Sequence, residues 1–382
     1  MNAQLRILDL PIYCLERSPS LTPFLKWPGG KSQELSAIAA ATPPLTGRFI
    51  DPFVGGGSVL LAVPVEVDAW VNDAAADLIE LYRAAAEERP AFRDAAEGVA
   101  RAWDALRSFE GVYRAVADEF LDGSSGLGAV SAVGRSPSLG LALALAGPGL
   151  EDAFAARLAK DLPSKFDRMR KIQLALGRKL SDPDLLANVE GAVRAALYMS
   201  IRARYNRARL SETWNEIRLA DFLFLREFAY AAMFRFNSRG EFNVPYGGVT
   251  YNRKSFVDKL DILFSAGMLG RLRNTTWRCG DFELFLREAA PAGSDFVFVD
   301  PPYDSDFSDY DNLPFGSRDQ ERLQQVLEGL SARVMVVIKD TPMIRRLYGS
   351  DRWRVESADK TYMWTIKSRN DRDATHLTIT NY

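Results

Sequence analysis

The stretch "GRFIDPFVGGGSVLLAV", residues 47–63, places a short apolar segment before three successive glycines and a second apolar segment after them. The pattern predicts a strand that ends at Asp51, a glycine loop and the start of a helix. Because glycine has no Cβ, Gly55, Gly56 and Gly57 allow a tight turn and let a ligand approach the backbone closely. The loop matches neither G-x-G-x-x-G nor a P-loop, so a diphosphate is not the expected ligand.

Further strand and helix patterns follow this stretch and return toward the end of the chain. Residues 67–85, "VDAWVNDAAADLIELYRAA", predict a second strand that runs into a helix, and residues 21–83 therefore have the order of a βαβ unit. Strand patterns return from about residue 277 in "TTWRCGDFELF", "DFVFVDPPY" and "ARVMVVIKD", and two later candidates are "ESADKTYMWTIKS" and "HLTITNY". This order predicts an α/β fold.

The middle of the chain has a different composition. Residues 84–234 are rich in Ala, Leu, Arg and Glu at helical spacing, which predicts a mostly helical insertion. Residues 121–150 are biased toward Gly, Ser and Ala, so we expect a flexible segment without chemistry. From Lys165 to Arg209 there are 11 Lys or Arg and 4 Asp or Glu, a net charge of +7. This segment could contact nucleic-acid phosphates, or it could be a solvated helical face.

Composition limits the chemistry that the chain can perform. The 382 residues are 47% hydrophobic and 26% charged, which is typical of a soluble protein with one large or two ordinary domains. No apolar run reaches the roughly 18 residues of a membrane span, and the N-terminal segment lacks a signal-peptide pattern, so we expect a cytoplasmic protein with no membrane partner. Cys14, Cys279 and the single histidine, His376, cannot form a disulfide framework or a zinc cluster. Carboxylates, amides, aromatic and basic residues must therefore carry the chemistry.

A second carboxylate follows the glycine loop. Asp73 ends the next predicted strand 22 residues after Asp51, which matches the spacing of an acid that bonds the ribose of an adenosine-containing cofactor. Asp73 taken alone is better explained as a helix N-cap. The loop and the acid together favour a nucleoside cofactor.

Five ordered segments carry a specific resemblance. They are "FLKWPGGK" at 24–31, "DPFVGGGSV" at 51–59, "NDAAADLIELY" at 72–82, "FNSRGEFNVPYG" at 236–247 and "DPPY" at 300–303. With these segments the chain resembles the DNA N6-adenine methyltransferases of the Dam kind, the GATC-methylating family, over roughly residues 21–83 and 226–382. A single DPPY is weak evidence, but five segments in family order are hard to obtain by chance.

The resemblance implies an S-adenosylmethionine-dependent enzyme that acts on double-stranded DNA. Its fold would be α/β, with a seven-stranded mixed sheet and an inserted, mostly helical target-recognition domain. Residues 1–83 and 277–382 would form the two parts of the catalytic domain, and residues 84–276 the insertion. A cognate restriction endonuclease acting separately is a further partner that the resemblance suggests.

The resemblance also assigns cofactor contacts. The matching positions are Lys26, Trp27, Gly29, Lys31, Asp51, Pro52, Phe53, Gly55, Gly57, Asp73, Asp281, Phe282 and Asp300. Lys26 to Lys31 and the glycine loop would hold the methionine end, and Asp73 the ribose. Asp281 would accept a hydrogen bond from the cofactor adenine, although it could equally cap the following helix.

The DPPY segment answers a chemical need of the implied reaction. The N6 amine of adenine is a poor nucleophile because its lone pair is delocalised into the ring. The Asp300 carboxylate and the Pro301 carbonyl, fixed by the turn through Pro302, could accept the two amine hydrogens and orient the lone pair. The base must first leave the DNA helix, and Tyr303 could stack on it for about 1 to 3 kcal/mol.

Two segments are candidates for contact with DNA. Residues 235–251 predict a hairpin with a turn at Gly240, and the candidate DNA-contacting residues within it are Arg235, Asn237, Arg239, Asn243 and Tyr246. Arg239 could bond a guanine edge in two places, or it could be an ordinary exposed turn arginine. The other candidates, suited to following a phosphate backbone, are Arg202, Arg204, Arg207 and Arg209.

Other functions remain open at this level. An enzyme that methylates cytosine N4 or RNA could use the same pair of acceptors, and a DNA-binding module could retain the fold without activity. Residues 228–234, "FAYAAMF", depart from the family pattern, and the insertion is longer than a minimal GATC enzyme needs. The resemblance therefore does not extend to the GATC target itself.

Overall fold

The structure of the chain is a computed structural model. It describes residues 13–16, 21–123, 128, 130, 137–302, 315–358 and 376–382. The chain divides into two compact units. The sheet unit comprises Met1–Pro23, Gly29–Arg83 and Ala266–Tyr382, and the helical unit comprises Phe24–Pro28 and Ala84–Ser265.

A seven-stranded mixed sheet organises the described part of the sheet unit, as the resemblance implied. Its strands are β1 (Phe49–Asp51), β2 (Ala69–Asp73), β3 (Thr275–Cys279), β4 (Phe296–Val299), β5 (Arg333–Lys339), β6 (Arg354–Ala358) and β7 (His376–Thr380). The spatial order is β3-β2-β1-β4-β5-β7-β6. Neighbouring strands from β3 to β5 pair in parallel, whereas β7 runs antiparallel to both β5 and β6.

The order of the strands reverses between β1 and β4. β1 pairs with β2 on one side and with β4 on the other, with Phe49 opposite both Ala69 and Phe296. The chain continues outward from β2 to β3 on one side and from β4 to β5 on the other. Ligands of open α/β sheets bind beyond the carboxyl ends of the strands at such a reversal.

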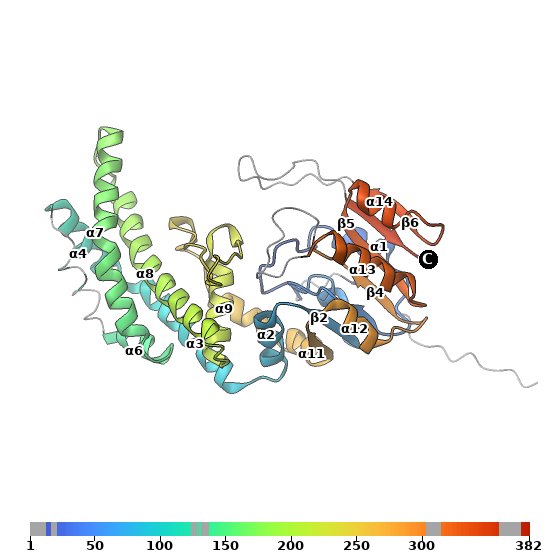
Figure 1. Cartoon of the computed structure of the whole chain (residues 1–382). Coiled ribbons are helices and arrows are strands. Elements are labelled where there is room, and N and C mark those ends of the chain that lie inside the picture. Colours follow the sequence, from blue (N-terminus) through green and yellow to red (C-terminus); the bar gives the residue numbers. More distant parts are fainter. Residues whose placement is uncertain are drawn as a thin grey trace, which may run out of the picture. The chain divides into compact units, whose positions relative to one another are not determined.

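Apolar residues hold the helices on the sheet. Every residue of β4 is buried, as expected for a parallel strand covered on both faces. One face carries α12 (Phe282–Ala289), α13 (Ser317–Glu328) and α14 (Pro342–Leu347), whose buried side chains share a core with β1, β4, β5 and β7 (Figure 1). The remaining described helices that begin in this unit are α1 (Leu35–Ala41), the 3₁₀ helix η1 (Leu60–Ala62), α2 (Ala76–Ala86) and α11 (Ala266–Arg273).

The helix predicted directly after the glycine loop is only a single 3₁₀ turn, η1. Pro64 follows it, and the residue before a proline is biased away from helical backbone angles. Val63 accordingly has extended angles, with φ −75° and ψ 126°. The prediction of a second strand running into a helix is confirmed by β2 and α2.

The helical unit consists mainly of helices in its described residues. They are α3 (Pro90–Ala105), η2 (Leu106–Ser108), α4 (Glu110–Leu121), α6 (Pro137–Leu145), α7 (Leu150–Leu176), α8 (Asp182–Leu210), α9 (Glu216–Phe228), η3 (Tyr230–Ala232), η4 (Val249–Tyr251) and α10 (Val257–Leu263). The long helices α7 and α8 lie side by side (Figure 1). None of the helices within the described ranges has the length and apolarity needed to span a membrane.

The expectation of a flexible segment at 121–150 is wrong for its second half. Residues 137–145 form α6, and Leu139 and Leu143 are buried. A Cβ added to Gly98 of α3 would lie 2.4 Å from the carbonyl oxygen of Leu145, so this glycine permits close packing of the two helices. The apolar run of α6 thus outweighs the Gly and Ser content of the segment. Residues 124–127, 129 and 131–136 lie outside the described part.

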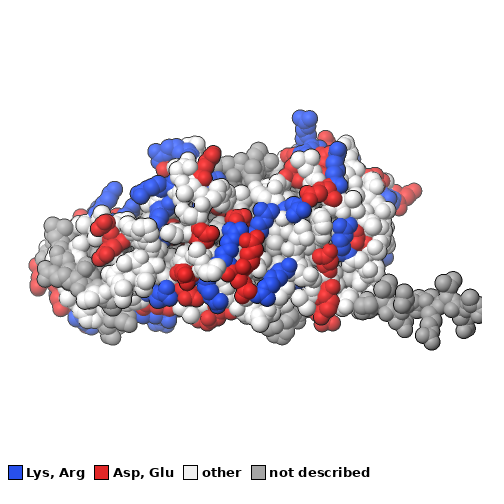
Figure 2. Space-filling model, turned by 90° about the horizontal axis from the view of Figure 1, so that it is seen from below, with Lys and Arg blue, Asp and Glu red and all other residues white. Residues whose placement is uncertain are grey.

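Basic and acidic side chains are mixed on the face seen in Figure 2. Lys and Arg side chains are interspersed there with Asp and Glu side chains. This mixture agrees with 48 basic and 50 acidic residues in the whole chain. The face seen in this view therefore carries no extended patch of one sign.

Candidate active site

Three carboxylates gather at the carboxyl ends of the central strands. Asp51 ends β1, Asp73 ends β2 and Asp300 directly follows β4. Asp51 is buried, and its Oδ1 accepts a hydrogen bond of 2.9 Å from the backbone N–H of Phe53. Burial raises the pKa of Asp51 well above its usual range, and the Asp300 and Asp73 carboxylates raise it further. The site is therefore electrostatically suited to a cationic ligand.

Lys31 is the cation that faces this cluster. Its Nζ lies 2.5 Å from Asp300 Oδ1, and it also donates a hydrogen bond of 2.9 Å to the carbonyl oxygen of Gly29. The Lys31 side chain is only 2% exposed and that of Asp300 is 19% exposed. Burial raises the pKa of Asp300, and the Lys31 ammonium opposes this shift. Lys31 thus orients the carboxylate that the sequence placed at the centre of the chemistry.

The glycine loop is held by its neighbours on β2 and α2. Asp73 Oδ2 accepts the N–H of Gly55 at 3.0 Å, and Oδ1 accepts the N–H of Ala75 at 2.9 Å. The buried Tyr82 hydroxyl donates to the carbonyl oxygen of Gly55 at 3.1 Å. Gly57 has φ +71°, and a Cβ there would lie 3.1 Å from the Tyr82 hydroxyl. Asp73 therefore shapes the loop and the turn before α2, and its ribose contact stays a prediction.

Two further loops border the same end of the sheet. The buried Asn72 side chain donates to the carbonyl oxygens of Pro52 at 3.1 Å and Gly280 at 3.0 Å, which ties the loops after β1 and β3 together. Asp281 caps α12 by accepting the N–H groups of Glu283 and Leu284, as the sequence allowed. Arg322 on α13 contacts both oxygens of the same carboxylate, at 3.2 and 3.0 Å.

Aromatic side chains pack beneath these loops. The rings of Phe53 and Phe282 lie 5.5 Å apart, and both contact Phe315. Phe282 is buried, whereas Phe53 is half-buried beside the glycine loop. The two phenylalanines that the sequence assigned to the cofactor site are therefore neighbours in space.

The turn after β4 is fixed from α13. The Gln320 side chain, which is fully buried, donates to the carbonyl oxygen of Pro302 at 3.0 Å. Pro301 is buried as well. This arrangement holds the backbone next to Asp300 in place. Tyr303, the predicted stacking residue, lies outside the described residues.

Sequence reasoning missed four residues that shape the site: Asn72, Tyr82, Gln320 and Arg322. Asn72 and Tyr82 lie inside a segment already singled out, so they could have been examined there. No local pattern marks Gln320 or Arg322, because their partners are 18 and 41 residues away in the chain.

Comparison with known proteins identifies the family. The profile described as D12 class N6 adenine-specific DNA methyltransferase matches residues 27–119 and 180–363. The chain belongs to this family. The residues at the carboxyl ends of β1, β2 and β4 lie within the matched ranges.

Individual relatives agree with this assignment. The Type II methyltransferase M1.LlaDCHI of Lactococcus lactis subsp. cremoris is 23% identical over 371 residues, covering 95% of this chain and 96% of the relative. The Retron Ec67 DNA adenine methylase of Escherichia coli is 31% identical over 219 residues, which are 53% of this chain and 73% of the relative. The Type II methyltransferase M.CviBI of Paramecium bursaria Chlorella virus NC1A is 33% identical over 165 residues, and the chain spans 60% of its length.

The first two residues of the predicted cofactor segment belong to the helical unit of this methyltransferase. Lys26 forms an ion pair of 2.8 Å with Glu227, a buried carboxylate that Lys254 also approaches, at 3.4 Å. Trp27 packs against Phe234, with ring centroids 5.6 Å apart. Their assignment to the methionine end of the cofactor stays a prediction.

The predicted phosphate-binding arginines of the methyltransferase do not form one set. Arg204 is used inside the protein, because its guanidinium pairs with the buried Asp221 at 2.9 and 2.7 Å and bonds the carbonyl oxygen of Ala146. This geometry does not fit a phosphate contact, so the prediction that Arg204 binds DNA phosphate is wrong. Arg204 instead joins α8 to Asp221 of α9 and to the carbonyl oxygen of Ala146. Arg207 is exposed.

The other two arginines of this group support the hairpin. Arg202 donates to the carbonyl oxygen of Val244 at 3.0 Å. Arg209 donates to the carbonyl oxygen of Gly240 at 2.6 Å and stacks on Phe236, with its guanidinium carbon 4.1 Å from the ring centroid. Both therefore position the segment predicted to read DNA.

The hairpin predicted at 235–251 has antiparallel arms near its turn. Phe236 pairs with Phe242, and Gly240 has φ +75°. Asn237 closes the turn, since its Oδ1 accepts the backbone N–H groups of residues 239 and 241, both at 3.0 Å. The Arg239 side chain is 78% exposed and pairs with Glu241.

Two more predicted DNA contacts of the hairpin lie outside its turn. Arg235 is exposed, and its Nε donates to Asn243 Oδ1 at 3.2 Å. Tyr246 is 9% exposed, its hydroxyl donates to Asn252 at 3.0 Å, and its ring packs on Trp103. The prediction that Tyr246 contacts DNA is wrong, because its ring is buried in the core of the helical unit.

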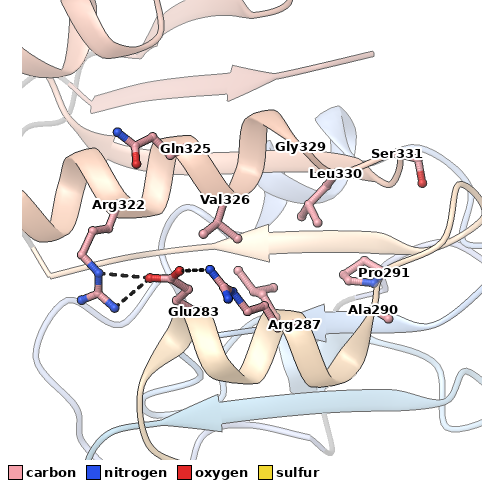
Figure 3. A pocket seen from close by; sticks show the side chains of 11 residues that line it. Glu283, Arg287, Ala290, Pro291, Arg322, Gln325, Val326, Gly329, Leu330 and Ser331 are labelled. Atoms are coloured by element: carbon pink, nitrogen blue, oxygen red, sulfur yellow. Dashed lines mark hydrogen bonds and ion pairs between the residues drawn. The ribbon is translucent and has the colours of Figure 1, made fainter.

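A groove of about 640 Å³ lies between α12 and α13 (Figure 3). Glu283 points into it from α12 and pairs with both Arg322 and Arg287. Its other end is lined by Ala290 and Ser331, which precede β4 and β5. The groove therefore begins beside Arg322, which also holds Asp281, and extends away from the carboxyl ends of the strands.

Proposed function

We propose that this D12-class methyltransferase transfers the methyl group of S-adenosylmethionine to N6 of an adenine that has left the DNA helix. The pairing of Lys31 with Asp300 at the strand-order reversal is the observation that carries the proposal. The arrangement places an oriented carboxylate where an α/β sheet binds its ligand.

The residues present fit S-adenosylmethionine. Its sulfonium and amino groups are cationic, and the crevice between β1, β2 and β4 holds Asp51, Asp73 and Asp300 against one lysine, Lys31. The glycine loop leaves the backbone accessible. The proposed contacts are Gly29, Lys31, Asp51, Pro52, Phe53, Gly55, Gly57, Asp73, Asp281 and Phe282, together with Lys26 and Trp27. The bound cofactor would supply an electrophilic methyl group.

The protein's own residues would prepare the target amine. Asp300 and the carbonyl oxygen of Pro301 would accept the two N6 hydrogens, which returns electron density to the nitrogen. Lys31 would keep the Asp300 carboxylate ionised and oriented, and Gln320 would keep the Pro301–Pro302 turn in position. Asp300 acts as an acceptor, since a carboxylate is too weak a base to deprotonate a neutral amine.

Contact with DNA is proposed for the exposed part of the hairpin. Arg239 would read a base edge, and Arg235, Asn237 and Asn243 of the same hairpin would contact DNA beside it. Arg207 of α8 would contact the phosphate backbone. The insertion as a whole would be the target-recognition domain. We further propose a cytoplasmic enzyme whose cognate restriction endonuclease, if present, acts as a separate protein, because two of the relatives are named Type II methyltransferases.

The test is Asp300→Ala with Asp340→Ala as the matched control. Asp340 follows β5 directly, as Asp300 follows β4, so both changes remove a carboxylate from the same position of a parallel strand. Methyl transfer to duplex DNA should be lost only in Asp300→Ala, while calorimetry should show S-adenosylmethionine binding within a few-fold of the parent in both variants. Substantial activity of Asp300→Ala would remove this residue from the mechanism.

A further inference from the structure

Helix α7 lies in a part of the chain that the family profile does not match. The matched ranges are 27–119 and 180–363, whereas α7 spans Leu150–Leu176. One side of the helix is buried and packs along α8; its residues include Leu158, Leu162, Phe166 and Met169. α7 is therefore anchored in the helical unit by one side, and its residues lie outside the matched part of the family profile.

The part of α7 that follows its first turn is basic. From Arg157 to the end of the helix at Leu176 there are six Lys or Arg and two Asp, a net charge of +4 in a chain whose total charge is −2, whereas Glu151 and Asp152 lie in the first turn. The two Asp are already paired, Asp161 with Arg157 and Asp167 with Arg170. The local charge thus differs in sign from that of the whole chain.

Three cations on α7 have no partner among the described residues. Lys160, Arg168 and Lys171 are exposed and form no ion pair with the described part of the chain. At about 100° per residue, their positions fall within roughly 80° of the helix circumference, opposite the buried side. We call Lys160, Arg168 and Lys171 the α7 stripe. It extends over about 16 Å at 1.5 Å per residue.

The like charges of the α7 stripe and its neighbours repel one another when no anion is bound. Residues three or four apart on a helix are neighbours, and equal charges at that spacing destabilise it. Arg168 and Lys171 are three apart, and Lys165 lies three residues before Arg168. Burial and the Arg168 charge lower the pKa of Lys165. A polyanion that approached the stripe would relieve this repulsion.

We propose that the α7 stripe binds the phosphate backbone of duplex DNA outside the bases that the enzyme recognises. The inference rests on DNA being the substrate of the D12 class and adds a contact that the family profile does not include. A 16 Å stripe is as long as about five base pairs at 3.4 Å each, which suits two or three phosphates on one strand. Such a contact would strengthen binding without reading sequence.

An anionic membrane is the alternative partner. Leu174 and Leu176 are exposed in the last turn of α7, and exposed leucines beside basic residues suit a lipid surface. They occupy only that turn, however, whereas the stripe covers three turns, and an established DNA substrate already supplies the complementary charge. DNA is therefore the partner to which the proposal commits.

The test compares the parent with a triple variant, Lys160→Gln, Arg168→Gln and Lys171→Gln. Binding is measured from 50 to 200 mM salt on a duplex of about 40 base pairs that contains one site found methylated by sequencing. Each lost phosphate contact should reduce the slope of log affinity against log salt by about 0.9, so two or three lost contacts should reduce it by about 1.8 to 2.7. Over this fourfold range of salt concentration the parent should lose about 12- to 42-fold more affinity than the variant.

Three controls make the result decisive. A variant with Lys160→Arg and Lys171→Arg keeps the charge and should keep the parent slope. Arg318→Gln, Arg346→Gln and Arg354→Gln remove the same charge from exposed positions of the sheet unit and should also leave the slope unchanged. On a duplex that covers little more than the methylated site, the parent and the triple variant should bind alike.

Several outcomes would overturn the proposal. One is an unchanged slope of log affinity against log salt in the triple variant, and another is an equal change of slope in the sheet-unit control. A third is a triple variant that binds DNA normally but no longer binds vesicles of anionic phospholipid. Because the stripe is exposed, the free energy of unfolding of the triple variant should lie within about 0.5 kcal/mol of that of the parent. This measurement separates a loss of DNA binding from a loss of folding. An active Asp300→Ala variant would refute the proposed mechanism without changing the slope, so the two failures are distinguishable.

Discussion

At the scale of single residues, the site is an arrangement of buried carboxylates balanced by one ammonium. Asp51 and Asp300 both have raised pKa values because they are buried, and Lys31 stabilises the ionised form of Asp300. An ionised Asp300 is the form that can accept both the lysine and an amine hydrogen. The protonation state of the site should therefore respond to single substitutions.

Lys31→Met should move the acidic limb of the pH–rate profile to higher pH. Without the ammonium, the pKa of Asp300 rises further, so the ionised acceptor is lost at a higher pH. An opposite charge at this distance typically shifts a carboxyl by about 1 to 3 units, and the limb should move by a similar amount. The measurement is kcat against pH, with Lys339→Met at the end of β5 as control. An unmoved limb would mean that Lys31 does not control Asp300.

Asp51→Asn should stabilise the folded protein and weaken cofactor binding. A carboxyl with a raised pKa binds its proton more tightly in the folded than in the unfolded chain, so the free energy of unfolding falls as pH rises through that pKa. Asn removes this loss while its Oδ1 can still accept the Phe53 N–H. Urea unfolding at pH 7 should show a gain of about 1 kcal/mol. A variant less stable than the parent at pH 7 would contradict the assignment.

At the scale of elements, the insertion uses basic residues in two different ways. Arg204 of α8 forms a bidentate pair with Asp221 of α9, and both are largely shielded from water. Arg239, in contrast, lies in an exposed turn. Charge in a basic segment therefore contributes to folding at one position and remains available to a partner at another.

Arg204→Ala should destabilise the helical unit rather than weaken DNA binding selectively. Removing one member of a buried ion pair leaves the Asp221 carboxylate without its partner, at a cost of about 3 to 5 kcal/mol. Arg207→Ala, three residues further along the same helix, should change stability by no more than about 0.5 kcal/mol. Thermal unfolding monitored by circular dichroism compares the two. Equal melting temperatures for both variants would refute the structural role of Arg204.

Arg239→Ala should relax the preference among target sequences. A bidentate arginine–guanine contact contributes about 1 to 3 kcal/mol of discrimination, and this difference should disappear in binding to matched and mismatched duplexes. Arg354→Ala is the control, because that side chain is 72% exposed and also paired with a glutamate two residues away. If Arg239→Ala weakens binding to all duplexes equally, the residue contacts phosphate instead of a base.

At the scale of the whole molecule, the chain joins two units with separate cores. The chain passes between them several times, since residues 24–28 belong to the helical unit while residues 29–83 belong to the sheet unit. The proposed cofactor contacts fall mainly in the sheet unit, apart from Lys26 and Trp27. The response to cofactor should therefore differ between the units.

Hydrogen exchange with and without S-adenosylmethionine should show this difference. At a concentration of 100 times Kd the cofactor adds about 2.7 kcal/mol of stability to the state that binds it. Protection should increase in residues 49–57, 71–75 and 296–302, and it should not change in α7. Protection of residues 24–28 would support the cofactor assignment of Lys26 and Trp27, and unchanged exchange there would remove it. Protection confined to α7 would contradict the proposed cofactor site.

The sequence by itself determined the class of fold and the chemistry of the family. Strand and helix periodicity, the glycine loop and the DPPY segment are local patterns, and β1, β2, β4 and β5 lie where those patterns placed them. The cap at Asp281 was also foreseeable, because a cap involves residues two and three positions away. Local backbone preferences and apolar periodicity are encoded over short distances, so they can be read without knowledge of the packing.

Tertiary structure alone decided which partners the polar residues have. Lys31 and Asp300 are 269 positions apart, and only the order of the strands brings them together. Arg204 and Tyr246 are residue types that often contact DNA. In the folded chain, however, Arg204 pairs with the buried Asp221 carboxylate and Tyr246 packs against the ring of Trp103. A charged or aromatic side chain fits either a surface or an interior, and the free energy of burial that chooses between them depends on neighbours distant in the sequence.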